Sequence, residues 1–172
     1  RWIIDPIDGT KAFTRGVPLY STLVAVEDQH GPAVGIIELP ALGQRVFAGR
    51  GLGCTVVDFH GERPARVSDT SAIGDALLCT SGFGSWSPEQ VQAAHASGAL
   101  LRTWGDGYGY ALVATGEADA MVDPVGAEWP VAPMSVILAE AGGRFTALDG
   151  HEGADRGHGL ATTGHIHDQV IE

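Results

Sequence analysis

The sequence has 172 residues, of which 44% are hydrophobic, and a formal net charge of −11 at pH 7. This length and apolar content predict one domain, residues 1–172, with its own hydrophobic core. Ten Lys and Arg against 21 Asp and Glu argue against a nucleic-acid-binding protein, because such binding depends on cations that neutralise phosphates. The sequence contains no run of eighteen apolar residues, so we expect no membrane span.

The first predicted element is a strand at residues 2–4, whose continuous apolar run is typical of a strand buried on both faces. Asp5 precedes Pro6, which keeps Asp5 extended, so we expect the chain to turn directly after it. This turn predicts that Asp8 comes back beside Asp5. Two such carboxylates repel each other unless a cation lies between them, and Mg²⁺ is commonly held by one or two carboxylates plus phosphate. A plain strand-ending turn remains the alternative interpretation of the motif.

A short helix is expected to follow, from Thr10 to Arg15, ending at Gly16. Gly9 lets the backbone approach a ligand closely, and free N–H groups at a helix start attract an anion. Lys11 opposes the helix dipole in the first turn, which is consistent with a phosphate bound nearby. The segment therefore predicts a combined metal and phosphate site.

The remaining elements divide the chain into two parts. Residues 20–27, 33–39, 44–50 and 54–59 are predicted strands without intervening helices, which indicates an antiparallel sheet. Further strands are predicted at 76–80, 100–103, 118–122, 144–147 and 160–163, and helices at 88–95, 108–115, 130–141 and 165–171. The succession predicts an α+β fold.

Cysteines and histidines do not predict a second metal site. Cys54 and Cys79 lack the paired spacing of a zinc site, and we expect free thiols in a reducing compartment. His165 and His167 are two residues apart, which is the wrong spacing for one helical face, so we expect solvated or capping histidines.

Residues 2–10, Trp-Ile-Ile-Asp-Pro-Ile-Asp-Gly-Thr, resemble the metal-binding signature of the inositol monophosphatase-like, Mg²⁺-dependent phosphatase family. Residues 8–18 are most similar to its histidinol-phosphatase branch, and the similarity continues to residues 161–164. The resemblance implies a layered αβαβα sugar-phosphatase-like fold, incomplete at the N-terminus because the chain begins inside the motif. It also implies a cytoplasmic enzyme that acts on a small phosphorylated metabolite, with a homodimer as a candidate assembly.

The resemblance also implies roles for the residues of the motif. Asp5 would bridge metal ions, and the Ile7 carbonyl and Asp8 would each bind one. Gly9 and Thr10 would hold the phosphate and help to orient an attacking water. The implied activity is Mg²⁺-dependent phosphomonoester hydrolysis.

Two further acidic residues match positions where relatives contact the leaving-group alcohol, namely Asp106 and Asp123. Acidic residues at both positions suit a cationic substrate such as histidinol phosphate, and inositol or another sugar phosphate is the alternative. Roles as turn and cap residues also remain open.

The chain departs from the family in its metal ligands. Relatives carry acidic ligands upstream of the first strand, and they have Trp-Asp where this chain has Trp129-Pro130. Proline has no ligand atom in its side chain, and Glu128 would point to a different side. We therefore expect this chain to be feeble or inactive, and a non-catalytic relative that binds a phosphorylated metabolite or a partner subunit is the alternative of another class.

Overall fold

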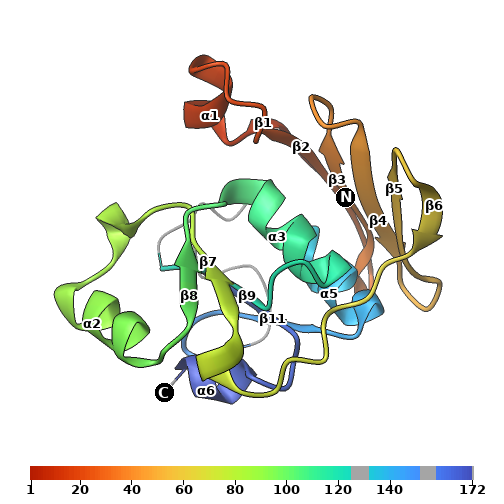
Figure 1. Ribbon diagram of the computed structural model, residues 1–172. Coiled ribbons are helices and arrows are strands. Elements are labelled where there is room, and N and C mark those ends of the chain that lie inside the picture. The colour runs from red at the N-terminus through yellow and green to blue at the C-terminus, as the bar shows by residue number, and fades with distance from the viewer. Residues whose placement is uncertain (125–131, 152–157, 172) are drawn as a thin grey trace.

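The computed structural model of the protein describes residues 1–124, 132–151 and 158–171. Its strands form a six-stranded and a five-stranded sheet, with helices α3 (Asp106–Thr115) and α5 (Met134–Ala141) between them (Figure 1). The prediction of a layered α+β fold is confirmed.

The first sheet is an antiparallel meander in chain order, as predicted. It contains β1 (Trp2–Asp8), β2 (Ser21–Asp28), β3 (Gly31–Leu39), β4 (Gln44–Gly49), β5 (Gly53–Asp58) and β6 (Gly61–Pro64), of which β6 was not predicted. Helix α5 approaches β3 so closely that a Cβ on Gly35 would lie 2.5 Å from the carbonyl oxygen of Pro133. A glycine at this position therefore sets the distance between sheet and helix.

Strand β1 lies at the edge of this sheet and differs from the prediction. Ile3 is buried, whereas Trp2 is 70% and Ile4 57% exposed, so the prediction of burial on both faces was wrong. An edge strand that packs on one face alternates in burial even where its residues are all apolar. The strand also continues through Pro6 to Asp8, with an irregular register between Asp5 and Asp8, where a separate turn was expected. Proline is tolerated there because an edge strand does not need every N–H group.

The second sheet is mixed. Its order is β10 (Arg144–Thr146), β11 (Gly159–Thr162), β9 (Ala120–Asp123), β7 (Leu77–Cys79) and β8 (Leu100–Arg102). Strand β7 is parallel to both of its neighbours, and the other pairs are antiparallel. The ends of β7 and β9 therefore lie side by side, next to the start of α3.

Local signals set most helix ends. Helix α2 (Pro88–Ala96) starts at a capping box in which Ser87 and Gln90 exchange side-chain and backbone hydrogen bonds, and α3 and α5 end at left-handed glycines, Gly116 and Gly142. Helix α3 begins two residues before the predicted Tyr108. The late helix was predicted to start at residue 130, which lies outside the described residues. Ala132 and Pro133 are described and precede the helix, so α5 begins later than predicted, at Met134. The remaining helices are α1 (Thr10–Thr14), α6 (His167–Ile171) and the 3₁₀ helices η1 (Ile73–Asp75) and η2 (Phe83–Ser85).

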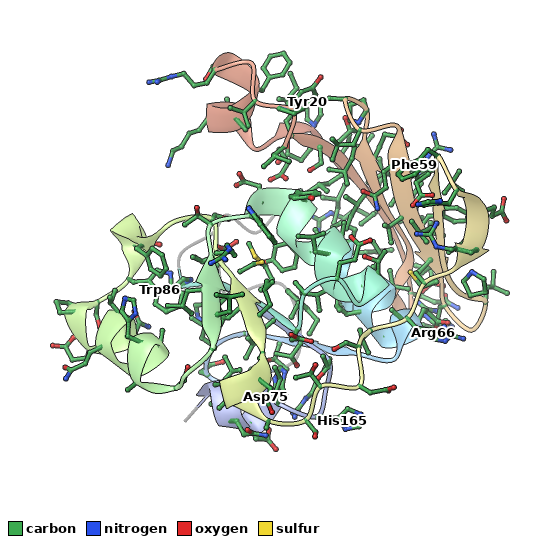
Figure 2. The ribbon with its side chains drawn as sticks, viewed as in Figure 1. Tyr20, Phe59, Arg66, Asp75, Trp86 and His165 are labelled. Carbon is green, nitrogen blue, oxygen red and sulfur yellow. The ribbon has the colours of Figure 1, made fainter. Side chains whose placement is uncertain are left out.

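Two apolar clusters lie on opposite faces of the second sheet. The larger one joins α3 and α5 to the inner faces of both sheets. The smaller one covers the other face of the second sheet, where Ile166 and Val170 of the C-terminal segment pack together with Trp86. Figure 2 labels Trp86, on the side of α2. The layers thus run sheet, helices, sheet, helices.

Three buried groups bear on the predictions for cysteine and histidine. Cys54 and Cys79 are free and buried, and burial raises the pKa of each thiol to about 11. His167 is fully buried between the hydroxyls of Thr146 and Thr162, at 2.9 and 2.8 Å, so the prediction that it is solvated or capping was wrong. Within the described ranges, no helix is long and apolar enough to span a bilayer.

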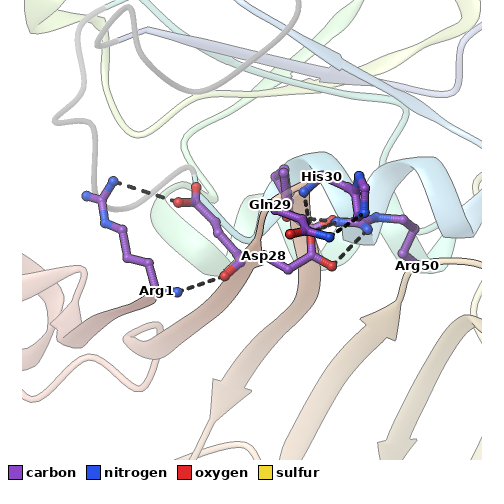
Figure 3. A network of polar contacts seen from close by, with 8 residues as sticks. Arg1, Asp28, Gln29, His30 and Arg50 are labelled. Carbon is purple, nitrogen blue, oxygen red and sulfur yellow. Dashed lines mark hydrogen bonds and ion pairs between the residues drawn. The ribbon is translucent and has the colours of Figure 1, made fainter.

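An arginine fixes one end of the first sheet. Arg50 donates to both carboxylate oxygens of Asp28 at 3.1 Å and to the carbonyl oxygen of Pro32 at 2.7 Å (Figure 3). These bonds hold the pKa of Asp28 below its ordinary value. Arg1 lies nearby and its N-terminal amine donates to the carbonyl oxygen of Glu27 at 2.7 Å. The strand register places this network at the far end of β1 and β2 from Asp8, which pairs with Ser21.

Candidate active site

A cavity of about 550 Å³ lies where the end of β1, helix α1, the end of β7 and the first turn of α3 meet. Figure 1 shows α1 above the first turn of α3. The cavity is lined by Asp5, Asp8, Gly9, Thr10, Lys11, Ala12, Arg15, Val17, Leu19, Ser81, Thr103, Gly105 and Asp106. Five of the seven residues predicted for the site are in this set, and Ile7 and Asp123 are not.

Asp8 is the most firmly held carboxylate of the site. It is 6% exposed, and its Oδ2 accepts hydrogen bonds from Ser21 Oγ and from the backbone N–H of Gly107, both at 2.6 Å. Among the described residues, none donates a hydrogen bond to Oδ1. Burial raises the pKa of Asp8, although these two hydrogen bonds lower it, and the charges of Asp5 and Asp123 raise it further. Oδ1 is therefore the atom of Asp8 that is available to a cation.

Residue 107 has to be glycine for this arrangement. A Cβ there would lie 2.2 Å from Ser21 Oγ and 2.9 Å from Asp8 Oδ2. Because glycine has no side chain, the first turn of α3 can approach β1 and β2 closely enough for its N–H to reach the buried carboxylate. The positive end of the helix then faces Asp8.

Asp5 lies beside Asp8, as the motif predicted. It is half-buried, its Oδ1 accepts a hydrogen bond from the backbone N–H of Ile7 at 3.2 Å, and its charge contributes to the raised pKa of Asp8. The Ile7 carbonyl, expected to face a metal, accepts a hydrogen bond from Thr10 Oγ1 at 3.1 Å. Both carboxylates thus face one cavity, and Ile7 is not among the residues that line it.

Gly9 and Thr10 begin α1 at the edge of the cavity. Gly9 caps the helix with φ +75°, a left-handed conformation that glycine adopts without strain, and a Cβ there would lie 3.3 Å from Asp106 Oδ2. Phe13 of the helix packs edge-on against Tyr20, which Figure 2 labels, with 5.0 Å between the ring centroids. The short helix is therefore anchored next to the first turn of α3.

Asp106 begins α3 and faces the cavity. Its φ of +52° is the only positive value at a non-glycine residue in the described ranges, and its N–H donates to Ser81 Oγ at 2.9 Å. Burial raises the pKa of Asp106 from 3.8 to about 6; the charges of Asp8 and Asp123 also raise it, and Lys11 partly opposes them. Asp106 is thus ionised near neutral pH, at a cost in free energy.

Asp123 lies behind Ser81 rather than on the cavity wall. Its two oxygens accept hydrogen bonds from the N–H and the hydroxyl of Ser81, both at 2.9 Å, and Tyr110 OH is 3.5 Å away. Burial raises the pKa of Asp123 even though these bonds lower it. Ser81 therefore links the two acidic residues, and the sequence analysis did not identify it.

The donor set fits a hard divalent cation. Asp5 and Asp8 supply only oxygen ligands, and Asp106 lines the same cavity. Burial is the main reason that the pKa values of Asp8 and Asp106 are raised, and repulsion by neighbouring carboxylates adds to it. In the part of the chain that the structure describes, no three His, Cys, Asp or Glu side chains are close enough to hold a metal by themselves. Mg²⁺ is commonly bound through one or two carboxylates, with water or phosphate oxygens at the other positions. Residues 128–130, where a further ligand was considered, lie outside the described ranges.

Solved structures define the class of protein. The extragenic suppressor protein SuhB of Bartonella henselae is 28% identical and superposes with a TM-score of 0.85, covering 99% of this chain and 70% of that one. An IMPase of Thermotoga maritima is 27% identical with a TM-score of 0.86, covering 99% and 66%. The chain therefore has the inositol monophosphatase fold.

Sequence comparisons give the family. The chain is 38% identical to the histidinol-phosphatase of Mycobacterium tuberculosis and 35% identical to that of Streptomyces coelicolor, in each case over 99% of this chain and 68% of the relative. The fructose-1,6-bisphosphatase/inositol-1-monophosphatase of Thermotoga maritima is 30% identical over 99% and 66%. The model of the inositol monophosphatase family matches residues 1–172, the whole of this chain. This chain belongs to the inositol monophosphatase family.

Proposed function

We propose that this protein is a Mg²⁺-dependent phosphomonoester hydrolase whose substrate is histidinol phosphate. The observation that carries the proposal is the convergence of Asp5 and Asp8 with Gly9 and Thr10 on one cavity. Two carboxylates next to a helix start provide a place for a divalent cation beside a place for an anion. Membership of a phosphatase family supports the same reading.

The chain's own residues would prepare the site for hydrolysis. Asp5 and Asp8 would hold Mg²⁺, which, when bound, neutralises phosphate charge and lowers the pKa of a water molecule. Ser21 and Gly107 keep Asp8 in one orientation through hydrogen bonds of 2.6 Å to Oδ2. Thr10 Oγ1 donates its proton to the Ile7 carbonyl, so its oxygen remains available to accept a hydrogen bond from an attacking water.

The substrate assignment depends on the acidic wall of the cavity. Asp106 has a pKa of about 6, so it is ionised at higher pH. It lies at the cavity surface, where it would attract the ammonium group of an amino alcohol. Similarity to two histidinol-phosphatases favours this substrate. Similarity to a fructose-1,6-bisphosphatase/inositol-1-monophosphatase makes inositol or sugar phosphates the second candidates. With histidinol phosphate as substrate, the protein would act in histidine biosynthesis, in the cytoplasm, as a monomer or homodimer.

A relative that binds a phosphorylated metabolite without hydrolysing it is the candidate of another class. Trp129-Pro130 stands where relatives have Trp-Asp, and this difference in the sequence favours such a binder. A binder would take up inorganic phosphate but release none from an ester.

Phosphate release from L-histidinol phosphate tests the proposal. Because this chain has Trp129-Pro130 where relatives have Trp-Asp, we expect slow release. The release should require Mg²⁺, stop on chelation and be lost in Asp8→Asn, with myo-inositol 1-phosphate hydrolysed more slowly still. Asp58→Asn is the matched control, because Asp58 lies on β5 at the opposite side of the first sheet from β1. Equal release with and without chelator, or no release from either ester, would overturn it.

A further inference from the structure

Helix α1 gives the cavity a cationic wall opposite its acidic residues. Lys11 lies in α1 and Arg15 is the residue directly after it, where the helix ends. Both line the cavity together with Ala12. The site therefore contains both signs of charge, with the cations on the side of Gly9 and Thr10.

These two cations differ from the other basic residues of the described chain. Nine of the ten Lys and Arg residues are described, and seven donate to a carboxylate or to a backbone carbonyl, as Arg50 does in Figure 3. The seven are Arg1, Arg45, Arg50, Arg63, Arg66, Arg102 and Arg144. Within the described ranges, Lys11 and Arg15 make no hydrogen bond or ion pair through their side chains. Among the nine basic residues that the structure describes, the two whose side chains make no such contact are both at the cavity.

The charges around the cavity indicate that these two cations bind an anion. Two like charges four residues apart repel each other, so each of these cations destabilises the other. Lys11 lowers the pKa of Asp106, which shows that its charge acts across the cavity. A phosphate dianion that enters meets Asp5, Asp8 and Asp106, and it needs cations on the opposite side. The guanidinium of arginine and the ammonium of lysine are the side chains that bind phosphate oxygens best.

We propose that Lys11 and Arg15 bind the phosphoryl oxygens of the substrate from the α1 side and so orient an amino-alcohol phosphate with its ammonium group toward Asp106. The orientation rests on the proposed function, whereas phosphate binding by the two cations does not. Binding by these side chains adds to the contacts expected from the metal and from the backbone of α1.

Calorimetric titration with inorganic phosphate in the presence of Mg²⁺ tests the proposal without requiring turnover. We compare the wild-type chain with Lys11→Gln/Arg15→Gln and with a control, Arg45→Gln/Arg144→Gln, which removes the same charge from exposed, ion-paired positions on β4 and β10. Loss of two charge-assisted contacts should weaken phosphate binding about tenfold or more, while the control should change it less than about twofold. Lys11→Arg/Arg15→Lys should retain most of the affinity.

The possible results of the phosphate titrations distinguish this proposal from the proposed function. Equal phosphate affinity in the wild type and in Lys11→Gln/Arg15→Gln refutes the role of the two cations and leaves the proposed function standing. An equal loss in the control shows a general effect of net charge, which also refutes it. If the wild type takes up no phosphate, both this inference and the proposed phosphate site are wrong.

Discussion

Asp106→Asn should make the protein more stable in the absence of divalent cations. Burial and neighbouring carboxylates raise the pKa of Asp106 from 3.8 to about 6, so ionising it in the fold costs free energy. The side chain is partly exposed, and after allowance for solvent screening we expect a cost of about 1–2 kcal/mol. Asparagine removes the charge and tolerates the φ of +52° better than other side chains.

The effect should depend on pH. Because the pKa is raised, the folded state binds this proton more tightly than the unfolded state, and the wild type loses stability as pH rises from 3.8 through about 6. The variant should therefore be more stable than the wild type by about 1–2 kcal/mol at pH 8, which raises the melting temperature by about 2–8 °C. The difference should shrink toward zero near pH 4.

Urea unfolding at about pH 4.5 and pH 8, in a chelating buffer, measures both effects. Asp58→Asn is the control with the opposite sign, since Arg63 lowers the pKa of Asp58 and removal of that carboxylate should cost stability. If Asp106→Asn is less stable than the wild type at pH 8, or if the difference in free energy of unfolding does not change with pH, the reasoning about the acidic wall is refuted.

Three further predictions concern stability. Ser21→Ala removes the 2.6 Å bond to Asp8 and should cost about 1–3 kcal/mol by urea unfolding; an unchanged midpoint would contradict it. Gly35→Ala places a Cβ 2.5 Å from a carbonyl at the start of α5 and should cost about 1–3 kcal/mol or more, whereas Gly84→Ala, which meets nothing within 4 Å, should cost little. Burial lowers the pKa of His167 to about 4, so the stability of the wild type should fall as pH drops from 6.5 toward 4. His167→Gln should lose this dependence on pH. If the free energy of unfolding changes equally with pH in both proteins, another group is responsible.

Local patterns predicted most elements and the centre of the site. The run that ends in Asp5 and Asp8 predicted the strand, the short helix and the shared cavity, although the strand continues to Asp8 where a turn was expected. The Ser-Pro start of α2 and the glycine end of α5 were equally local signals. The helix at Asp106 was placed two residues late, since glycines disfavour helices. The reason for these glycines is close packing, of Gly107 on Ser21 and of Gly109 on Met121, between segments that are distant in the sequence.

The rest of the site depends on contacts between distant segments. Ser21 and Ser81 hold Asp8 and Asp123 across 13 and 42 residues of sequence, and nothing in their local sequence indicates these partners. Arg15 was taken only as the end of a short helix, and its place on the cavity wall follows from how α1 sits on the sheet. The burial of β1 on a single face likewise follows from its position at the sheet edge.

The central claim is that Asp5 and Asp8 together bind a divalent cation, and calorimetric titration with Mg²⁺ measures this directly. We predict saturable uptake of Mg²⁺ by the wild-type chain and its loss in Asp5→Asn/Asp8→Asn, with the fold of the variant checked by circular dichroism. Uptake of the same strength by the variant, or no uptake by the wild type, would contradict the account.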